Sequence, residues 1–469
     1  MSRLDWMPDL TGRTGPMYEQ IATALREDIL EGRLKAGDQL PPQRDLSVAL
    51  GVTVGTVSRA FGEVIRADLI EAGSRRGTRV KERTAHAGFM SGNPGVLGEA
   101  QAIVDLRGHQ TAVASWGQRI NKAMLERSTR GDIDPILRYD DFAGRAAHRA
   151  VGAQWLSKEA HEVDPARVVV TNGAQHALLC ALLSISRRGD NIATERLTYT
   201  GLRSVAPLLG LNLIPVDIDR HGILPASFAQ VCATQRIAAL VCVPNLHNPT
   251  TAVLPLDRRK ELVRIASAND VMIIEDDVYN GLVDPGVQSL ASLAQERVIR
   301  LTSFSKTLGP GLRIGYIEAP RSWVATIADA IRATTWMASP IAAELATELI
   351  LSGEAASILN ENRTELALRN TALRRELKDA GLKNELHGPH AWIELPAPWT
   401  VKQFTTWIES RGYKVSGADG FAVSRDDVDH AVRISVSAAP SVDSLTRFGR
   451  LIAEALPQGP QVNDITAFP

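Results

Sequence analysis

The chain of 469 residues has only three cysteines, Cys180, Cys232 and Cys242. They lie far apart in apolar stretches, without CxxC spacing and without paired histidines. This pattern excludes a disulfide framework and a zinc-finger type of site. We therefore predict no metal site, and we expect three free thiols in a reducing cytoplasm.

Long hydrophobic runs are missing as well. No stretch approaches the roughly 18 apolar residues that a membrane span requires. The first residues, Met1-Ser-Arg-Leu-Asp-Trp6, include an early acid and lack the apolar run of a signal peptide. We therefore expect a cytoplasmic protein without a membrane segment.

Neither sign of charge is in excess. The chain has 52 lysines and arginines against 53 acidic residues, a net charge of -1. The whole chain is therefore not a polycation, and any contact with DNA has to come from local charge. The hydrophobic fraction of 44% is ordinary for a globular protein. The length predicts two or three domains.

The first eighty residues show a pattern of three helices. Apolar residues at four-residue spacing predict a helix over 18–32, and a short helix follows over 43–50. Gly51 makes a turn before a third helix over 53–67. In this third helix we expect an apolar face that consists of Val57, Phe61, Val64 and Ile65.

The remaining face of the third helix, together with a basic turn, predicts a DNA-binding surface. Two short strands are expected over 69–71 and 77–80, with a basic run between Ala72 and Lys81. A short basic run alone favours a solvated loop, but its position after a helix-turn-helix favours DNA. The second helix of such a motif enters the major groove. A plain three-helix interaction domain is the alternative. The predicted DNA-binding residues are Arg44, Thr53, Thr56, Ser58, Arg59, Arg75, Arg76 and Thr78.

Beyond residue 103, short β-rich runs alternate with helical ones, which predicts an α/β domain with a mostly parallel sheet. From about Glu344 a long helical stretch, two strand-like runs and a further helix predict a small α+β domain. Candidate strands lie at 167–171, 191–194, 212–216, 238–243, 271–275 and 298–301, and candidate helices at 174–186, 202–209, 257–268 and 323–334. The predicted domains are 1–81, a linker of 82–103, 104–343 and 344–469.

Four polar residues follow the predicted strand at 298–301. Ser303, Ser305 and Lys306 stand together, and Arg313 comes seven residues after the lysine. A lysine can hold the aldehyde of pyridoxal 5'-phosphate, while serines and a bidentate arginine hold its phosphate. A lone lysine is usually a surface residue. The four residues in this order after a strand favour the cofactor.

The other needs of pyridoxal phosphate are an acid at the ring nitrogen, donors to the ring oxygen and a stacking ring. We expect Asp276 to pair with the ring nitrogen, Asn248 and Tyr279 to donate to the ring oxygen, and Tyr199 to stack. The amides at the start of the helix over 174–186 would meet the phosphate. That helix start comprises Gly173, Ala174 and Gln175. The expected catalytic residues are Lys306, Asp276 and Tyr279.

Residues 17–80 resemble a GntR-type winged helix-turn-helix. The motifs that carry this resemblance are Pro42-Gln-Arg-Asp-Leu46, Leu50-Gly-Val52, Thr56-Val-Ser-Arg-Ala60 and Gly77-Thr78. Residues 104–455 resemble a fold-type I aminotransferase, on the cofactor motifs given above. Together the two parts resemble the MocR/GabR-like subfamily of GntR transcriptional regulators.

The resemblance implies a homodimer that binds a double-stranded DNA operator and senses an amino acid or amine through an aldimine with pyridoxal phosphate. It implies that Arg433 grips a substrate carboxylate, and that Tyr139 reaches the phosphate of the neighbouring subunit. An active aminotransferase with an accessory DNA-binding domain remains the alternative. The chain departs from the family pattern where Leu197 replaces a proline. The spacing of Asp276 and Tyr279 is that of enzymes, which favours retained transamination.

Overall fold

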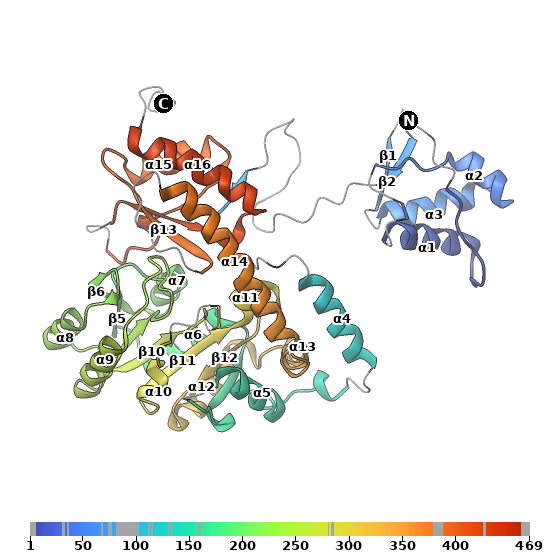
Figure 1. The fold of residues 1–469 in the computed structure, drawn as a ribbon. Helices are drawn as coiled ribbons and strands as arrows, with labels where there is room; N and C mark the ends of the chain where they lie inside the picture. The colour runs from blue at the N-terminus through green and yellow to red at the C-terminus, as the bar shows by residue number, and fades with distance from the viewer. Residues whose placement is uncertain are drawn as a thin grey trace. The chain divides into compact units, whose positions relative to one another are not determined.

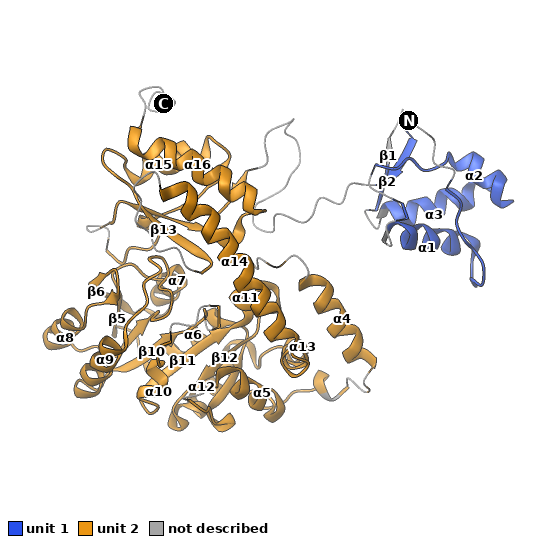
Figure 2. Ribbon diagram, in the orientation of Figure 1, with its two compact units in different colours: residues 1–99 blue, residues 100–469 orange. Residues whose placement is uncertain are grey.

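The computed structural model describes residues 6–30, 33–34, 37–66, 69–73, 77–80, 103–110, 113, 116–129, 131, 134–157, 161–279, 281–282, 286–378, 388–424 and 428–460. The chain divides into two compact units, residues 1–99 and residues 100–469 (Figure 2). The predicted linker at 82–103 lies outside the described residues except for Ile103.

The first unit is a winged helix-turn-helix. It comprises α1 (Met17–Leu30), α2 (Gln43–Leu50), α3 (Val54–Arg66) and an antiparallel hairpin of β1 (Ile70–Gly73) and β2 (Gly77–Val80) (Figure 1). Gly51 ends α2 in the left-handed region, at φ 65°, where glycine has no steric cost. This turn brings α3 across α2, as the sequence predicts.

The apolar face of α3 is narrower than predicted. Val57, Phe61 and Val64 are fully buried, but Ile65 is 39% exposed, so its predicted place in the core is wrong. Eight residues separate Ile65 from Val57, and eight helical steps rotate a side chain by about 80°. Ile65 therefore falls at the edge of the buried stripe.

No single helix among the described residues is long and apolar enough to cross a membrane. One bent pair, Gln43–Leu50 with Val54–Ile65, meets the length and composition criterion only when its two helices are taken together, at a bend of 119°. This pair is α2 and α3, and Leu46, Val57, Ala60, Phe61 and Val64 from the two helices belong to the core of the winged helix.

The second unit is built on a seven-stranded sheet. In spatial order its strands are β4 (Val168–Thr171), β12 (Gly315–Glu318), β11 (Val298–Ser303), β10 (Met272–Asp276), β9 (Ala239–Cys242), β5 (Asn191–Glu195) and β6 (Asn212–Val216). All neighbours are parallel except at β12, which is antiparallel to β11 and to β4. The predicted mostly parallel sheet is confirmed.

Helices cover both faces of this sheet, so its strands are apolar on both sides. Ile192, Val241, Ile274 and Ile299 pack against α6 (Ala174–Ile185), α7 (Thr200–Leu209) and α12 (Arg321–Thr335). Their neighbours along the strands, Ala193, Leu240, Ile273 and Val298, pack against α8 (Pro225–Thr234), α9 (Leu256–Ala268) and α10 (Leu290–Leu293). Near β4, the covering helices are α5 (Ala146–Leu156) and α13 (Pro340–Leu351).

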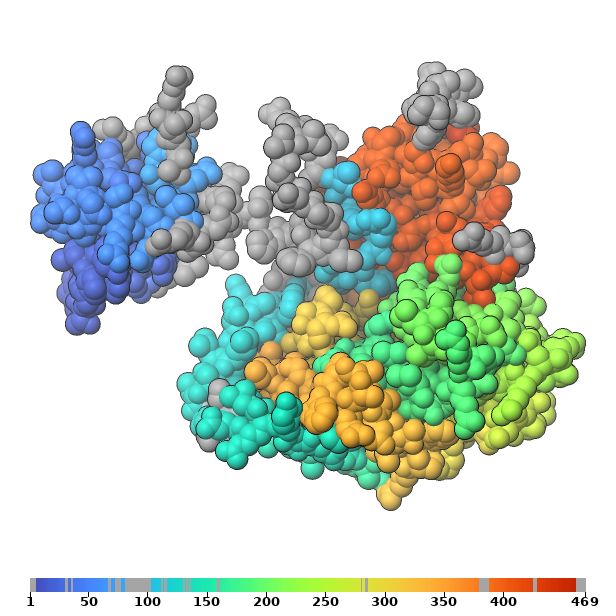
Figure 3. Space-filling view, turned by 180° about the vertical axis from the view of Figure 1, so that it is seen from behind, coloured from blue at the N-terminus to red at the C-terminus, as the bar shows by residue number. Residues whose placement is uncertain are grey.

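A smaller lobe follows α14 (Glu354–Lys378). Its sheet has the order β13 (His390–Glu394), β16 (Ala431–Ser435), β15 (Ser416–Gly417), and α15 (Val401–Glu409) and α16 (Val442–Gln458) complete it. Figure 3 shows the surface of this lobe in orange-red, above the green surface of the larger lobe. The helical stretch from Glu344 is two helices, because Gly353 at φ 79° separates α13 from α14.

The small lobe also contains residues from far upstream. Strand β3 (Val104–Asp105) pairs in parallel with β14 (Tyr413–Lys414). Leu106 N also donates to Lys414 O at 2.8 Å, and Ser435 N donates to Leu106 O at 2.7 Å. Residues 104–106 therefore lie on the small lobe before the chain reaches α4 (Trp116–Thr129).

Candidate functional site

The carboxyl ends of the parallel strands gather the predicted cofactor residues at one edge of the sheet, as this topology requires. Asn172 follows β4, Asp276 ends β10 and Ser303 ends β11. Strand β12 runs the opposite way and starts at the same edge, with Gly315 in register with both Thr171 and Ser303. Arg313, two residues before β12, is thereby held between the ends of β4 and β11.

Arg313, Ser305 and the start of α6 form an open cup. Arg313 Nη1 donates to Ser305 Oγ at 3.3 Å, and Nη2 donates to Asn172 O at 3.3 Å. Gly173 lies at φ 84°, and a Cβ there would be 2.9 Å from Arg313 Nη2. The cup thus combines a guanidinium, a hydroxyl and the first amides of a twelve-residue helix, which is the chemistry of a phosphate site.

Ser303 lies behind this cup. Its hydroxyl accepts from Ser305 N at 3.1 Å and donates to Ile314 O at 3.2 Å, so it caps the short helix α11 (Phe304–Thr307). The capping holds Ser305 and Lys306 at the helix start. Ser303 is buried, and its contacts position the other two residues.

Tyr199 and Gln175 are packed together at the start of α7. Gln175 Nε2 donates to Gly201 O at 3.1 Å, and a side chain at Gly201 would collide with both Gln175 and Tyr199. Burial raises the pKa of Tyr199, with the charge of Asp276 as the next cause. The ring of Tyr199 is therefore fixed beside the carboxylate that is expected at the cofactor's ring nitrogen.

Two adjacent aspartates have different surroundings. Asp277 is bound inside the protein, since its carboxylate accepts from Arg300 Nε at 3.0 Å and from Asn245 Nδ2 at 2.9 Å. Asp276 is 6% exposed, and its Oδ1 accepts from Val278 N at 3.3 Å. Burial raises the pKa of Asp276 to about 7. A cationic ring nitrogen next to Asp276 would relieve this cost.

Lys306 is the amine of the site. Its pKa is lowered to about 8, chiefly by burial and also by the charges of Arg433 and Arg313, while Asp276 acts in the opposite direction. A lowered pKa leaves a usable fraction of neutral amine near neutral pH, which attack on an aldehyde requires. Lys306 is thus near enough to Arg433, Asp276 and Arg313 for their charges to act on its amine.

Arg433 on β16 has a donor to spare. Its Nη1 donates to Asn248 Oδ1 at 2.8 Å, Nη2 donates to Arg107 O, and its guanidinium lies 4.8 Å from the ring centre of Phe421. The buried Nε has no partner among the described residues. A buried guanidinium with a free donor fits a carboxylate. Since Asn248 accepts through Oδ1, its Nδ2 remains available to donate to a ring oxygen.

The structure adds three residues that the sequence did not predict. His109 Nε2 lies 3.3 Å from the hydroxyl of Tyr279, and its ring packs against His390 with centroids 5.2 Å apart. The third, Ser435, lies opposite His390 in the register of β13 and β16. Only the two-residue step between Arg433 and Ser435, which puts both on one face of a strand, was available in the sequence as a signal.

Tyr139 lies on the surface of its own chain. It is 81% exposed, and its ring centre is 5.7 Å from that of Trp336, which is 47% exposed. Phe142 contacts the other side of this cluster, at 5.6 Å from Trp336. Tyr139 is therefore free to meet another subunit.

The predicted DNA-binding residues on α3 and just before it are accessible. Thr53, Ser58 and Arg59 are exposed, and Thr53 shares a hydrogen bond of 2.9 Å with Thr56. Arg59 is not free, because its guanidinium lies 3.7 Å above the ring of Tyr18 on α1. Elsewhere in the unit, Arg44 is exposed at the start of α2 and Thr78 is half-buried in β2. Arg75 and Arg76 lie outside the described residues.

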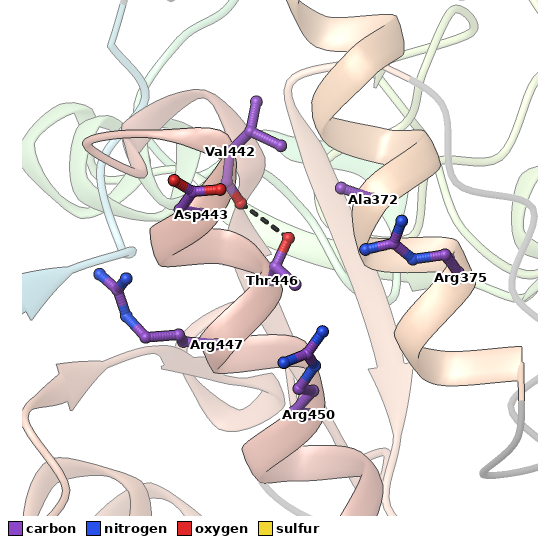
Figure 4. A pocket seen from close by; sticks show the side chains of 7 residues that line it. All are labelled: Ala372, Arg375, Val442, Asp443, Thr446, Arg447 and Arg450. Atoms are coloured by element: carbon purple, nitrogen blue, oxygen red, sulfur yellow. Dashed lines mark hydrogen bonds between the residues drawn. The ribbon is translucent and has the colours of Figure 1, made fainter.

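A hollow on the small lobe lies apart from the predicted residues. Figure 4 shows it between α14 and α16, with Thr446 bound to the carbonyl of Val442. Glu376 pairs with Arg375 and Arg450, each at 2.9 Å, and so offsets part of the positive charge there. The lining residues are Ala372, Arg375, Val442, Asp443, Thr446, Arg447 and Arg450.

Comparison with known families agrees with this geometry. Residues 104–450 match the family "Aminotransferase class I and II". The chain belongs to this family. Residues 17–80 match "Bacterial regulatory proteins, gntR family". The predicted combination of a GntR winged helix with an aminotransferase fold is therefore confirmed, and pyridoxal phosphate is the cofactor of class I and II aminotransferases. Regulators of the GntR type bind DNA operators.

Curated relatives align with this chain over almost its whole length. The HTH-type transcriptional regulator YdeF of Bacillus subtilis is 28% identical over 94% of this chain and 95% of its own. The vitamin B6 salvage pathway transcriptional repressor PtsJ of Salmonella typhimurium is 27% identical over 90% of this chain and 95% of its own. The kynurenine aminotransferase of Pyrococcus horikoshii shares the fold, with a TM-score of 0.71 over 77% of this chain and 92% of its own, at 22% identity.

Proposed function

We propose that the protein is a transcriptional regulator that binds pyridoxal phosphate at Lys306 and senses an amino acid or amine there. The observation that carries the proposal is that Lys306 and Asp276, at one edge of the large sheet, lie close to Arg433 of the small lobe, in a chain that also has a winged helix. Bound pyridoxal phosphate supplies an aldehyde that joins to an amine. Binding to an operator requires a location in the cytoplasm.

Each residue of the site has a role that its surroundings support. The amine of Lys306 holds the aldehyde, and Asp276 keeps a proton on the ring nitrogen. Arg433 binds a carboxylate of the effector through its free donor. The phosphate is held by Arg313, Ser305 and the amides of Ala174 and Gln175, behind which lie Gly173 and Ser303. Tyr199 stacks on the ring, and Asn248 and Tyr279 donate to the ring oxygen.

We further propose a homodimer. Support comes from exposed apolar side chains around Tyr139, which neighbour the phosphate cup through the hydrogen bond from Asn172 Nδ2 to Thr335. One winged helix reads a half-site, so a symmetric operator calls for two. Around Tyr139, the exposed apolar residues are Leu137, Trp336 and Ile341. Sedimentation of the cofactor-bound protein at micromolar concentration tests the dimer.

The regulator is tested by measuring DNA affinity as a function of effector. Operator fragments are first selected from random double-stranded DNA with the pyridoxal phosphate-bound protein. Fluorescence anisotropy then follows the chosen fragment while single amino acids and amines are added. We expect one class of amine to change the affinity at least fivefold, a common size for allosteric coupling. Unchanged affinity across the panel would contradict the proposal.

A second function is favoured by one observation, the Asp276-x-x-Tyr279 spacing within a complete cofactor set. In this alternative the protein transaminates amino acids, and the winged helix is accessory. A steady-state assay with pairs of amino acids and keto acids separates the two. Turnover without any effect on DNA affinity would favour the enzyme.

A further inference from the structure

The hydroxyl of Tyr279 has an acceptor within the protein. His109 Nε2 lies 3.3 Å from it, and the two rings meet edge to face with centroids 6.0 Å apart. Tyr279 is buried, and burial raises its pKa, so the phenol keeps its proton at neutral pH. A phenol has one proton to donate. The imidazole therefore competes with any second acceptor for that proton.

The small lobe fixes the other side of the imidazole. His109 Nδ1 lies 3.2 Å from Ser435 Oγ on β16, and Ser435 Oγ in turn lies 3.5 Å from Pro389 O. A carbonyl only accepts, so Ser435 Oγ donates to Pro389 O, and the oxygen of Ser435 accepts from the Nδ1 side of the ring. Nε2 is then the acceptor that faces Tyr279.

The charges around His109 keep it in this neutral form. Burial lowers the pKa of His109 well below its usual value, and Lys306, Arg433 and His390 lower it further. Tyr279, the other member of the pair, is near the charges of Arg433 and Asp276 and near the hydroxyl of Tyr199, and all three act on its pKa. These groups face the pair from α11, β16, β13, β10 and the start of α7. A neutral imidazole retains the lone pair that accepts from Tyr279.

We propose that His109 is a positioning residue that accepts the hydrogen bond of Tyr279 and so weakens the hydrogen bond that the tyrosine donates to the ring oxygen of pyridoxal phosphate. The inference rests on the proposed function, because it needs the cofactor at Lys306. The residue acts through Tyr279. It also joins the two lobes, since its Nδ1 is bound by the small lobe and its Nε2 faces the large one.

Two substitutions separate the two sides of the ring. His109→Gln can keep an acceptor near the position of Nε2, whereas His109→Asn can keep a polar group near Nδ1 but withdraws from Tyr279. The readout is the pH midpoint of the visible absorbance of lysine-bound pyridoxal phosphate. The ring oxygen accepts a hydrogen bond from the protonated nitrogen that joins Lys306 to the cofactor. A second donor to this oxygen weakens that hydrogen bond, and the nitrogen then loses its proton at a lower pH. We expect His109→Asn to lower the midpoint by roughly one pH unit, the size of one hydrogen bond.

The matched controls decide the role. His109→Gln is expected to keep the midpoint of the unsubstituted protein. In a Tyr279→Phe background, His109→Asn is expected to cause no further shift, because the group on which it acts is gone. Equal shifts in His109→Gln and His109→Asn, or a shift that persists in Tyr279→Phe, would overturn the positioning role.

A second readout needs no cofactor. In the protein without pyridoxal phosphate, the nitrogen-15 NMR shifts of His109 should show an unprotonated Nε2, and Tyr279→Phe should move that resonance. A protonated Nε2, or one that ignores Tyr279→Phe, overturns the inference. If the NMR result holds but the protein takes up no pyridoxal phosphate, the proposed function fails, and the role of His109 toward the cofactor fails with it. The two failures are thus distinguishable.

Discussion

Asp277 Oδ2 accepts a hydrogen bond from Arg300 Nε at 3.0 Å, one residue after the aspartate that faces Lys306. The pair is buried on both sides. The two neighbouring carboxylates at the end of β10 thus have different roles. Asp277 holds the fold together, and Asp276 is free for the cofactor.

Asparagine substitutions at the two positions should therefore affect different properties, the stability of the fold at Asp277 and the affinity for the cofactor at Asp276. Asp277→Asn breaks a buried ion pair and should cost about 3 kcal/mol of unfolding free energy. Asp276→Asn should leave the fold intact but weaken pyridoxal phosphate binding, because the ring nitrogen loses its partner. Urea unfolding and cofactor titration measure the two effects. If Asp277→Asn had the larger effect on cofactor affinity at equal stability, the assignment would be reversed.

Stability without cofactor should depend on the ionisation of Asp276. Its pKa is raised from 3.8 to about 7 in the folded protein, so between these pH values the folded state binds one proton more than the unfolded state. This contribution is complete below pH 4 and is lost as the pH rises to 7. Cofactor-free Asp276→Asn should therefore be a few kcal/mol more stable than the unsubstituted protein at pH 8, and equal to it near pH 4. Urea unfolding at both pH values checks this; a variant that is less stable at pH 8 would contradict it.

Attachment of the cofactor should speed up with pH. The pKa of Lys306 is lowered to about 8, and only the neutral amine attacks an aldehyde. We expect the rate of appearance of the visible band to rise up to about pH 8 and then level off. Lys306→Ala should abolish the band, whereas Lys260→Ala, at an exposed position on α9, should retain it. A rate that is flat between pH 6 and 9 would count against Lys306 as the titrating amine.

Arg433 should separate effector sensing from basal DNA binding. Arg433→Ala should abolish the response of DNA affinity to a carboxylated amine, while the visible band and basal affinity stay nearly unchanged. Arg447→Ala, an exposed arginine of the hollow in Figure 4, is the control and should respond normally. Loss of folding in Arg433→Ala would instead indicate a structural role, through its bond to Asn248.

The two arginines of the DNA surface should differ. Arg44 is exposed at the start of α2, so Arg44→Ala should weaken binding to all sequences and reduce the salt slope by about one. Arg59→Ala should relax specificity at a cost of roughly 1–3 kcal/mol, if its guanidinium leaves Tyr18 to reach a base. Anisotropy with matched and scrambled DNA measures both. The control is Arg264→Ala, on α9 of the other unit. Equal loss of specificity in Arg44→Ala would refute the division.

Two elements show how far the local sequence pattern reaches. The strand at 212–216 and the helix at 43–50 were predicted with the bounds that the structure has. Strand β12 was missed, because Gly315-Tyr-Ile-Glu318 is short and directly follows the cofactor motif. Its antiparallel direction depends on pairing with β4 and β11, which is a tertiary property.

The residues of the site also fall into those that local sequence predicts and those that depend on tertiary contacts. Ser305, Lys306 and Arg313 were found because they are close in sequence and follow a strand. His109 was missed, because its place beside Tyr279 arises from the pairing of β3 with β14 and from contacts with Ser435, more than 300 residues away. No local pattern in Gly108-His109-Gln110 indicates those contacts. Ser303 was found by spacing, but its use as a helix cap became evident only from its hydrogen bonds.

The pairing of β3 with β14 decides where the DNA-binding unit is attached. After the winged helix, the first strand of the second unit begins at Val104. This strand lies on the small lobe, which carries Arg433, and the chain reaches the large lobe with Lys306 only later. A ligand that draws Arg433 toward Lys306 would therefore move the anchor of the tether along with the arginine. Mechanical coupling between ligand and DNA reader would then need no relay of side chains, since the backbone of residues 104–106 is hydrogen-bonded to the lobe that carries Arg433.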